Sequence, residues 1–136
     1  MLELTTGDGE VIFDLTSRCE DFLTEVSASD GLLHVFVPHA TAGVAVLETG
    51  AGSDVDLLVT LRSLLPPAGP GDFGWHHRHG SPGHGRDHVL PALVAPFTVL
   101  PVVRGRLALG TWQSVTVVDT NVDNPHRSVR LSFLPG

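Results

Sequence analysis

The 136-residue sequence contains no lysine, and all eight of its basic side chains are arginines. A Schiff base with a carbonyl substrate and a phosphate-binding loop of the GxxxxGK[ST] type both require lysine, so both are excluded. Fifteen acidic residues outnumber the arginines and give a formal net charge of −7 at pH 7. Because nucleic-acid-binding domains carry a basic patch, this charge argues against a nucleic-acid partner.

Cysteines and long apolar runs are also scarce. Cys19 is the only cysteine, so no intrachain disulfide can form, which fits a reducing compartment. No apolar run approaches the roughly 20 residues of a membrane helix. The N-terminal MLELTTGDGEVIFDL has acidic residues where a signal peptide would need basic and apolar ones. We therefore expect a cytoplasmic protein that does not interact with a membrane.

The apolar pattern predicts one α+β domain over residues 1–136, with mainly antiparallel or mixed β-sheets packed against two to three helices. Residues 2–15 alternate apolar and polar side chains around Gly-Asp-Gly, which favours a β-hairpin. Arg104-Gly105 is expected to form a second hairpin turn. Further strands are expected at 32–37, 43–48, 98–103, 106–110, 114–120 and 128–134.

Two longer helices are expected where apolar residues recur at helical spacing. The first would have Ser17 and Glu20 as a capping box and would bury Cys19. The second would begin at Ser53, with Asp56 three residues later, and would carry a leucine stripe.

Pro66 should end the second helix, because proline cannot continue the hydrogen-bond ladder. Residues 66–74 contain six glycines and prolines and predict a loop. A short third helix is expected around residues 86–94.

Five of the eight histidines fall in the stretch FGWHHRHGSPGHGRDH, residues 73–88. Neutral imidazole is a common metal ligand. Successive side chains of an extended loop face opposite sides, so His76, His77 and His79 cannot all point the same way. His84 and His88 are four residues apart and would share one face of a helix. Spacing alone leaves a metal site and a solvated loop as open alternatives.

The remaining three histidines differ in their surroundings. His34 lies within the apolar strand LLHVFV and is expected to be a core or rim residue. His126 follows a proline in a turn and is expected at the surface. His39 stands at a strand end among small residues, in PHATAG, where an imidazole can face a cleft.

Three stretches, taken together, resemble one family: HATAGVAVLE (39–48), WHHRHGSPGHGRDH (75–88) and PVVRGRLALGTWQ (101–113). They are similar to the YjbQ-like family, also called the secondary thiamine-phosphate synthase family. That family carries a His-x-[Thr/Ser]-Ala segment, a Tyr-x-His…His segment and a Gly-Thr-Trp-Gln segment. The resemblance covers nearly the whole chain, and GRLALGTWQ is its most specific part.

The resemblance implies a divalent metal held by His39, His77 and His88, with His84 as a candidate fourth ligand. Three imidazoles with an open fourth position suit zinc, with magnesium as the alternative. The sequence departs from the family where Trp75 replaces a tyrosine, and where His84 occupies a position at which Asp or Asn is common.

The same resemblance assigns roles to the remaining site residues. Glu48 and Asp56 match two acids that could act as general base or orient a histidine, and Thr41 matches the hydroxyl partner of the first histidine. A leucine, Leu47, stands where an Asn often precedes the glutamate. The residues expected to bind substrate are Arg104, Gly110, Thr111, Trp112 and Gln113.

The resemblance therefore implies a metal-dependent homotrimeric enzyme that acts on a phosphorylated or otherwise anionic small molecule, with weak thiamine-phosphate synthase activity. That transferase reaction releases pyrophosphate, which is normally neutralised by a hard cation held by oxygens, so a histidine-rich site indicates that the named activity is secondary. Two alternatives stay open: a homotrimer that binds a metal or ligand without turnover, and a metal-dependent hydrolase. Loss of the metal would abolish the activity of an enzyme, whereas in a binding protein it would impair only stability or assembly.

Overall fold

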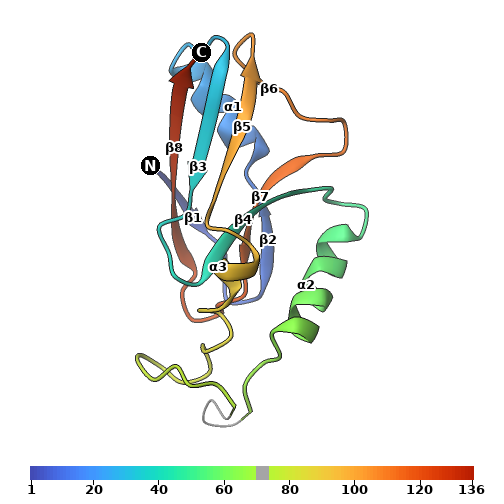
Figure 1. Cartoon of the computed structure of the whole chain (residues 1–136), viewed down its shortest axis with the longest axis vertical. Coiled ribbons are helices and arrows are strands. Elements are labelled where there is room, and N and C mark those ends of the chain that lie inside the picture. The colour runs from blue at the N-terminus through green and yellow to red at the C-terminus, as the bar shows by residue number, and fades with distance from the viewer. Residues whose placement is uncertain (70–73) are drawn as a thin grey trace.

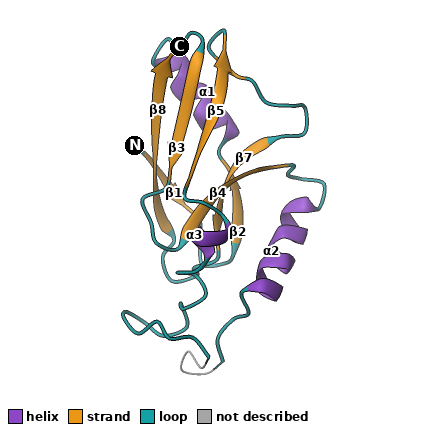
Figure 2. Ribbon diagram, viewed as in Figure 1, coloured by secondary structure: helices purple, strands orange, loops and turns teal. Residues whose placement is uncertain are grey.

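Residues 1–69 and 74–136, which the computed structural model describes, form eight strands in two antiparallel sheets together with three helices (Figures 1 and 2). The predicted α+β class is therefore confirmed, and the sheets are antiparallel throughout. The larger sheet has the order β1 (Leu2–Thr5), β8 (His126–Pro135), β3 (Gly31–Phe36), β5 (Phe97–Val103), β6 (Arg106–Leu107). The smaller sheet has the order β2 (Val11–Asp14), β7 (Ser114–Asp119), β4 (Ala42–Leu47).

The N-terminal hairpin predicted from residues 2–15 does not form. Instead, β1 pairs with β8 in the larger sheet, and β2 pairs with β7 in the smaller one. Gly7, whose φ is +81°, lies in the turn that carries the chain from one sheet to the other. Alternation fixes which side chains of a strand face inward, but it does not choose the partner strand.

The first long helix, α1 (Thr16–Glu25), lies against the larger sheet (Figure 1). The predicted Ser17–Glu20 capping box is absent, because Ser17 is the second residue of the helix and not its cap. The Asp14 carboxylate instead accepts the hydrogen bond from the Thr16 amide at 2.8 Å. Cys19 is fully buried on the inner face as predicted, and burial raises the pKa of its thiol to about 12. The thiol is therefore an inert core side chain.

The second long helix, α2 (Ser53–Leu64), follows Gly52, whose φ of +108° suits glycine. Ser53 is the first helical residue rather than the cap, so the predicted Ser53–Asp56 box is also absent. The helix ends before Leu65 and Pro66, as predicted. The third helix, α3 (Leu90–Leu93), is shorter than the expected 86–94.

Two apolar clusters divide the interior. The main one lies where α1 and the inner faces of both sheets meet, and it includes Leu23, Leu33 and Val117. The second joins α2, α3 and the smaller sheet through Leu61, Leu90 and Val118, and Trp75 packs against it. The second cluster therefore anchors the start of the histidine stretch to the fold. Among the described residues, no helix combines the length and apolar character needed to cross a bilayer.

A buried ion pair ties the two sheets together near the ends of β7 and β8. The Arg127 guanidinium donates to both oxygens of Asp119, at 2.7 and 2.9 Å, and also to the Thr41 hydroxyl at 2.8 Å. Arg127 is 1% exposed and Asp119 is fully buried. The Thr6 hydroxyl donates to the same carboxylate at 3.1 Å, so four segments of the chain meet at this pair.

We expect Arg127→Ala to lower the free energy of unfolding by about 3–5 kcal/mol, because it leaves the Asp119 carboxylate buried without its counter-charge. Arg130→Ala is the matched control: it removes an exposed arginine from the same strand, and we expect a change within about 0.5 kcal/mol. Urea denaturation of both variants checks this. Equal effects would show that the buried pair does not stabilise the fold.

Candidate metal centre

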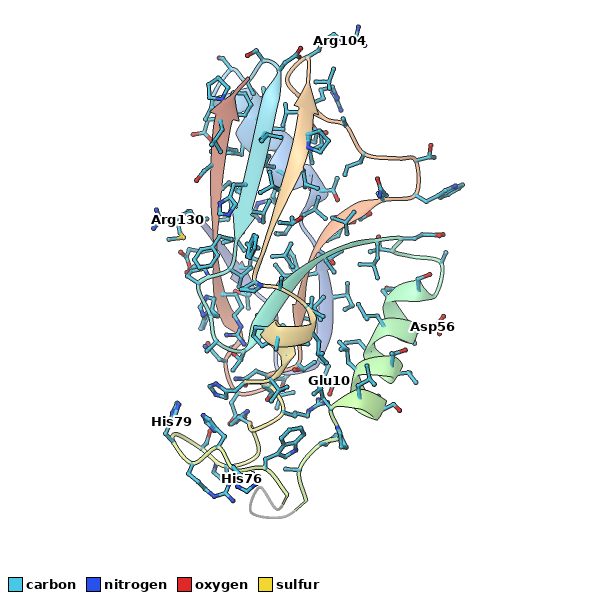
Figure 3. The ribbon with its side chains drawn as sticks, viewed as in Figure 1. Glu10, Asp56, His76, His79, Arg104 and Arg130 are labelled. Carbon is cyan, nitrogen blue, oxygen red and sulfur yellow. The ribbon has the colours of Figure 1, made fainter. Side chains whose placement is uncertain are left out.

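Three imidazoles, those of His77, His79 and His88, meet at the lower end of the molecule (Figure 3). One ring nitrogen from each lies within 4.8 Å of the others. The His77 and His88 rings are stacked with centroids 3.8 Å apart, and the His77 and His79 centroids are 4.3 Å apart. We call these three residues the histidine cluster. Zinc–nitrogen bonds are about 2.0–2.1 Å long, so the stacked rings would have to turn for their nitrogens to share one ion.

The loop that carries the cluster is fastened at its start by Trp75. The indole donates to the carbonyl oxygen of Pro66 at 3.1 Å. Gly85 approaches it so closely that a Cβ there would lie 2.3 Å from the Trp75 Cβ. The Arg78 guanidinium donates to the carbonyl oxygens of Trp75 and His77. These contacts fix the backbone directly before and after His77.

Arg86 fastens the second half of the loop. Its buried guanidinium pairs with the Glu10 carboxylate and donates to the Leu65 carbonyl oxygen at 3.0 Å. Glu10 also pairs with Arg62 of α2 at 2.7 Å. The histidine loop is thus joined to the end of α2 and to the turn between β1 and β2.

His88 follows a buried carboxylate that anchors its backbone. Asp87 is 2% exposed and accepts hydrogen bonds from the Thr120 hydroxyl at 2.5 Å and from His84 Nδ1 at 3.1 Å. The opposite ring nitrogen, His84 Nε2, lies 2.6 Å from Asp123 Oδ2, which also accepts from the Ser81 hydroxyl at 2.9 Å. A continuous chain of hydrogen bonds therefore runs from the end of β7 to the loop beside the histidine cluster.

These contacts favour the protonated form of His84. Burial by itself lowers the pKa of its imidazole, but the hydrogen bonds to Asp123 and Asp87 outweigh it, and the pKa is raised overall. The pKa of Asp123 is lowered, chiefly by its hydrogen bond with His84 and then by that with Ser81. His84 is therefore an imidazolium held between two carboxylates over a wider pH range than a free histidine.

The histidine cluster has the opposite character. Burial, and then the nearby rings of His77 and His79, lower the pKa of His88 and favour the neutral form that binds metals. Among residues 1–69 and 74–136, no group hydrogen-bonds to the buried His77 Nε2. A buried polar atom without a partner is destabilising. Three ring nitrogens this close together, on rings that include one unpartnered buried nitrogen, suit a divalent transition metal.

A cavity of about 240 Å³ adjoins the histidine cluster. His79 and His88 form part of its wall, so a small molecule in the cavity would lie against an ion bound by the cluster. The remainder of the wall is polar and comes from the histidine loop and the segment after β7: Gly80, Ser81, His84, Asn121, Asp123 and Asn124.

The comparisons with known proteins agree with this fold. A family model described as "UPF0047 protein YjbQ-like" matches residues 1–136. The chain belongs to the YjbQ-like family. It is 58% identical to the UPF0047 protein Rv2556c of Mycobacterium tuberculosis over 136 residues, which are 100% of this chain and 97% of that protein.

Two solved structures show the same fold. The hypothetical protein APE1520 of Aeropyrum pernix superposes with a TM-score of 0.86 at 34% identity, over 99% of this chain and 96% of that one. The conserved hypothetical protein TT1486 of Thermus thermophilus gives 0.81 at 32% identity, over 98% of each chain.

Within one chain of this YjbQ-like protein, the three histidines expected as ligands do not all lie together. His77 and His88 do come together, but their third neighbour is His79, and His39 is not in the cluster. His39 Nε2 instead accepts a hydrogen bond from the Ser128 amide of β8 at 2.8 Å. Burial, and then the charge of Arg127, lower the pKa of His39 and keep it neutral for that bond. His84 also differs from expectation, because carboxylates occupy both of its ring nitrogens.

The acids and the hydroxyl assigned to catalysis lie outside the cluster and the cavity wall in this chain. Thr41 is buried and accepts a hydrogen bond from Arg127. Glu48 is half-buried just after β4. Asp56 is exposed on α2, on the side of the molecule away from His79 (Figure 3).

The residues expected to bind substrate are also distant from the cluster within one chain. Arg104 occupies the β5–β6 turn at the opposite end of the molecule (Figure 3), where its amide donates to Asp30 at 2.6 Å. Thr111, Trp112 and Gln113 lie on the exposed loop between β6 and β7, with Trp112 72% exposed. Gly110 donates to the Gln113 side chain at 2.8 Å, which shapes that loop.

Sequence reasoning missed the polar residues that surround the cluster. Of these residues, Asp87 could have been identified from the sequence, because it directly precedes His88 and a carboxylate next to a histidine often orients a metal ligand. Ser81, Asn121, Asp123 and Asn124 gave no such signal, since only the fold brings the segment after β7 beside the histidine loop.

The pH dependence of stability tests the assignment of His84. A raised folded-state pKa stabilises the fold below the unfolded value near 6.5, and this contribution is lost as pH rises through the folded pKa. In metal-free protein, His84→Gln should therefore lose about 1–3 kcal/mol of unfolding free energy near pH 6 and less near pH 9. The exposed His126→Gln is the control. A loss for His84→Gln that is greater at pH 9 would contradict the assignment; urea denaturation at both pH values measures it.

Proposed function

We propose that this chain is a small metal-dependent enzyme that acts on a phosphorylated or otherwise anionic small molecule, with the metal held by His77, His79 and His88. The observation that carries the proposal is that one ring nitrogen of each of these three histidines lies within 4.8 Å of the others. Among the described residues, the buried His77 Nε2 also has no hydrogen-bond partner. The pKa of His88, lowered by burial and by the other two rings, adds support because a ligand must be neutral.

The donor set favours zinc over magnesium. Zinc takes nitrogen ligands in a tetrahedral arrangement, and catalytic sites leave its fourth position open. Magnesium prefers six oxygens, and the histidine cluster offers three nitrogens. When bound, such an ion supplies Lewis acidity for a phosphate or carbonyl oxygen.

The chain's own residues would bind and orient the ligand beside that ion. Asp123 is the one carboxylate that the described residues contribute to the cavity wall, so we assign to it the role expected of Glu48 or Asp56. Its Oδ2 is fixed by His84 and Ser81, which orients the carboxylate toward a ligand without further ordering. The thiamine-phosphate synthase activity implied by the resemblance remains, in this proposal, a secondary one, and the cytoplasm its setting.

We also propose that the protein assembles as a homotrimer, as the family resemblance implies. The outer face of the larger sheet supports self-association, because apolar side chains from adjacent strands meet there by register. Leu32 of β3 faces Leu134 of β8, and the neighbouring His34 faces Val99 of β5. We call this surface the outer sheet face; its exposed apolar members are Leu32, Phe97, Val99, Val103 and Leu134.

The metal proposal predicts about one divalent ion per chain in protein purified without chelator. His77→Ala, His79→Ala and His88→Ala should each lose it, because each removes one of three nitrogen donors. His34→Ala is the matched control that should keep it, and His39→Ala should keep it as well. Elemental analysis by mass spectrometry gives the metal content.

The outcome for two variants separates the alternatives. If His39→Ala lost the ion and His79→Ala kept it, the ligands would be those of the resemblance and not those of the histidine cluster. Turnover of a panel of phosphate monoesters and diphosphates, abolished by chelator and by His77→Ala, would establish an enzyme. A metal-loaded protein inactive on the whole panel would instead be the binding homotrimer.

The trimer proposal predicts a solution mass about three times the 14.4 kDa of one chain. Val99→Glu should shift the mass toward the monomer, because it places a charge in the outer sheet face. Val59→Glu on α2 is the matched control, since Val59 is 57% and Val99 48% exposed. Light scattering after size exclusion decides. A monomeric parent protein would refute the trimer, and a Val99→Glu trimer would refute this interface.

A further inference from the structure

The cavity beside the histidine cluster has a chemistry that the proposed function does not specify. Its wall contains two asparagines, a serine and one aspartate, in addition to three histidines and a glycine. Among the described residues, no arginine lines it, and the sequence has no lysine. The imidazolium of His84 is already paired with the Asp87 and Asp123 carboxylates. The wall therefore offers hydrogen bonds rather than a free counter-charge for an anion.

The positions of the arginines explain why. Arg104 lies at the far end of the molecule (Figure 3). Arg127 and Arg86 are buried against carboxylates. Arg78, the arginine within the cluster's own sequence, donates to backbone carbonyl oxygens. A phosphate in the cavity would lack the forked guanidinium partner that such groups usually have in proteins, and only an ion in the cluster would attract it.

The hydrogen-bonding groups of the wall are available to a neutral ligand. Asn121 uses its carbonyl oxygen to accept from the Asp123 amide at 3.0 Å, which leaves its NH₂ group as a donor. In the part of the chain that is described, both hydrogen bonds to the Asp123 carboxylate use Oδ2, which leaves Oδ1 as an acceptor. The Asn124 side chain supplies both a donor and an acceptor.

A positively charged ligand fits less well than one with hydroxyls. Asp123 already shares its charge with His84 at 2.6 Å, and an ion in the cluster would add two positive charges nearby. Coulomb repulsion would then disfavour an ammonium group. Hydroxyl groups both donate and accept, so they match a wall of carboxylate, amide and hydroxyl groups.

We propose that this cavity binds the polyhydroxylated part of a small ligand, such as a sugar or sugar-like polyol, while the anionic group of the ligand lies at the metal. This inference rests on the proposed function for the placement of the anionic group. The cavity volume of about 240 Å³ suits one small molecule of this kind.

Calorimetry on zinc-loaded protein tests the proposal with three probes: inorganic phosphate, ribose 5-phosphate and O-phosphoethanolamine. Ribose 5-phosphate should bind about 10-fold more tightly than phosphate, because its hydroxyl groups add hydrogen bonds to the wall; this ratio corresponds to about 1.4 kcal/mol. Asn124→Ala should remove most of that advantage and leave phosphate affinity unchanged. Ser63→Ala, an exposed polar side chain on α2, is the control and should change neither.

Equal affinities for phosphate and ribose 5-phosphate would overturn the proposal and leave the metal assignment intact. Tighter binding of O-phosphoethanolamine would also overturn it, because the cavity would then prefer a cation. A preference for ribose 5-phosphate that survives both Asn124→Ala and Asn121→Ala would place the sugar elsewhere.

A metal-free arm separates this proposal from the proposed function. Ribose added to chelator-treated protein should give saturation-transfer NMR signals that are lost in Asn124→Ala. If the purified protein held no metal, this arm alone would decide: signals dependent on Asn124 support the cavity assignment, and their absence refutes it.

Discussion

The end of β7 is the point on which the polar structure of this protein depends. Its last residue, Asp119, and the following Thr120 are both buried, and their side chains serve different parts of the fold. Asp119 receives the Arg127 guanidinium in the core. Thr120 donates to Asp87, directly before His88. Successive side chains of an extended backbone point in opposite directions, so one strand end can support both the ion pair between the sheets and the loop that carries the histidine cluster.

The segment at residues 39–48, which resembles the family's first histidine segment, has a structural role within one chain. Thr41 binds Arg127, and the His39 ring accepts the amide of Ser128, the next residue along β8. Both side chains thus hold the start of β4 against β8 beside the buried ion pair. Substituting either one would disturb Arg127 and Asp119 first, and the histidine loop only through the adjacent Thr120. Loss of function in a His39 variant would therefore not by itself identify a metal ligand.

Much of the fold could be predicted from local patterns, and the errors have physical causes. Five of the expected strands are present with ends shifted by one or two residues: 32–37, 43–48, 98–103, 114–120 and 128–134. They could be predicted because β-branched residues favour strands and each of these runs contains buried residues. The hairpin at residues 2–15 is wrong because β1 and β2 find better partners more than 100 residues away. Both capping boxes fail because Asp14 and the left-handed Gly52 start the helices instead.

The candidate site, too, could be predicted only in part from local sequence patterns. The resemblance pointed to His77 and His88, whereas the position of His79 beside them depends on how the loop folds back, which strand and helix periodicity do not encode. Trp75 and Arg86 determine that path through hydrogen bonds to the backbone just after α2, and Arg86 also pairs with Glu10 in the turn after β1. Gly85 allows the returning loop to lie against Trp75. Asn121, Asp123 and Asn124 join the cavity only because β7 ends beside the loop.

The three imidazoles of the cluster come from a twelve-residue stretch, 77–88, and this has a thermodynamic consequence. Closing a short loop costs less chain entropy than joining distant segments, so an ion could order this stretch with little cost to the rest of the fold. The hydrogen bonds of Trp75, Arg86 and Asp87 already order part of this stretch, so less chain entropy is lost when an ion binds. If the proposed metal binds, we therefore expect its affinity to depend more on these three residues than on the packing of the main core.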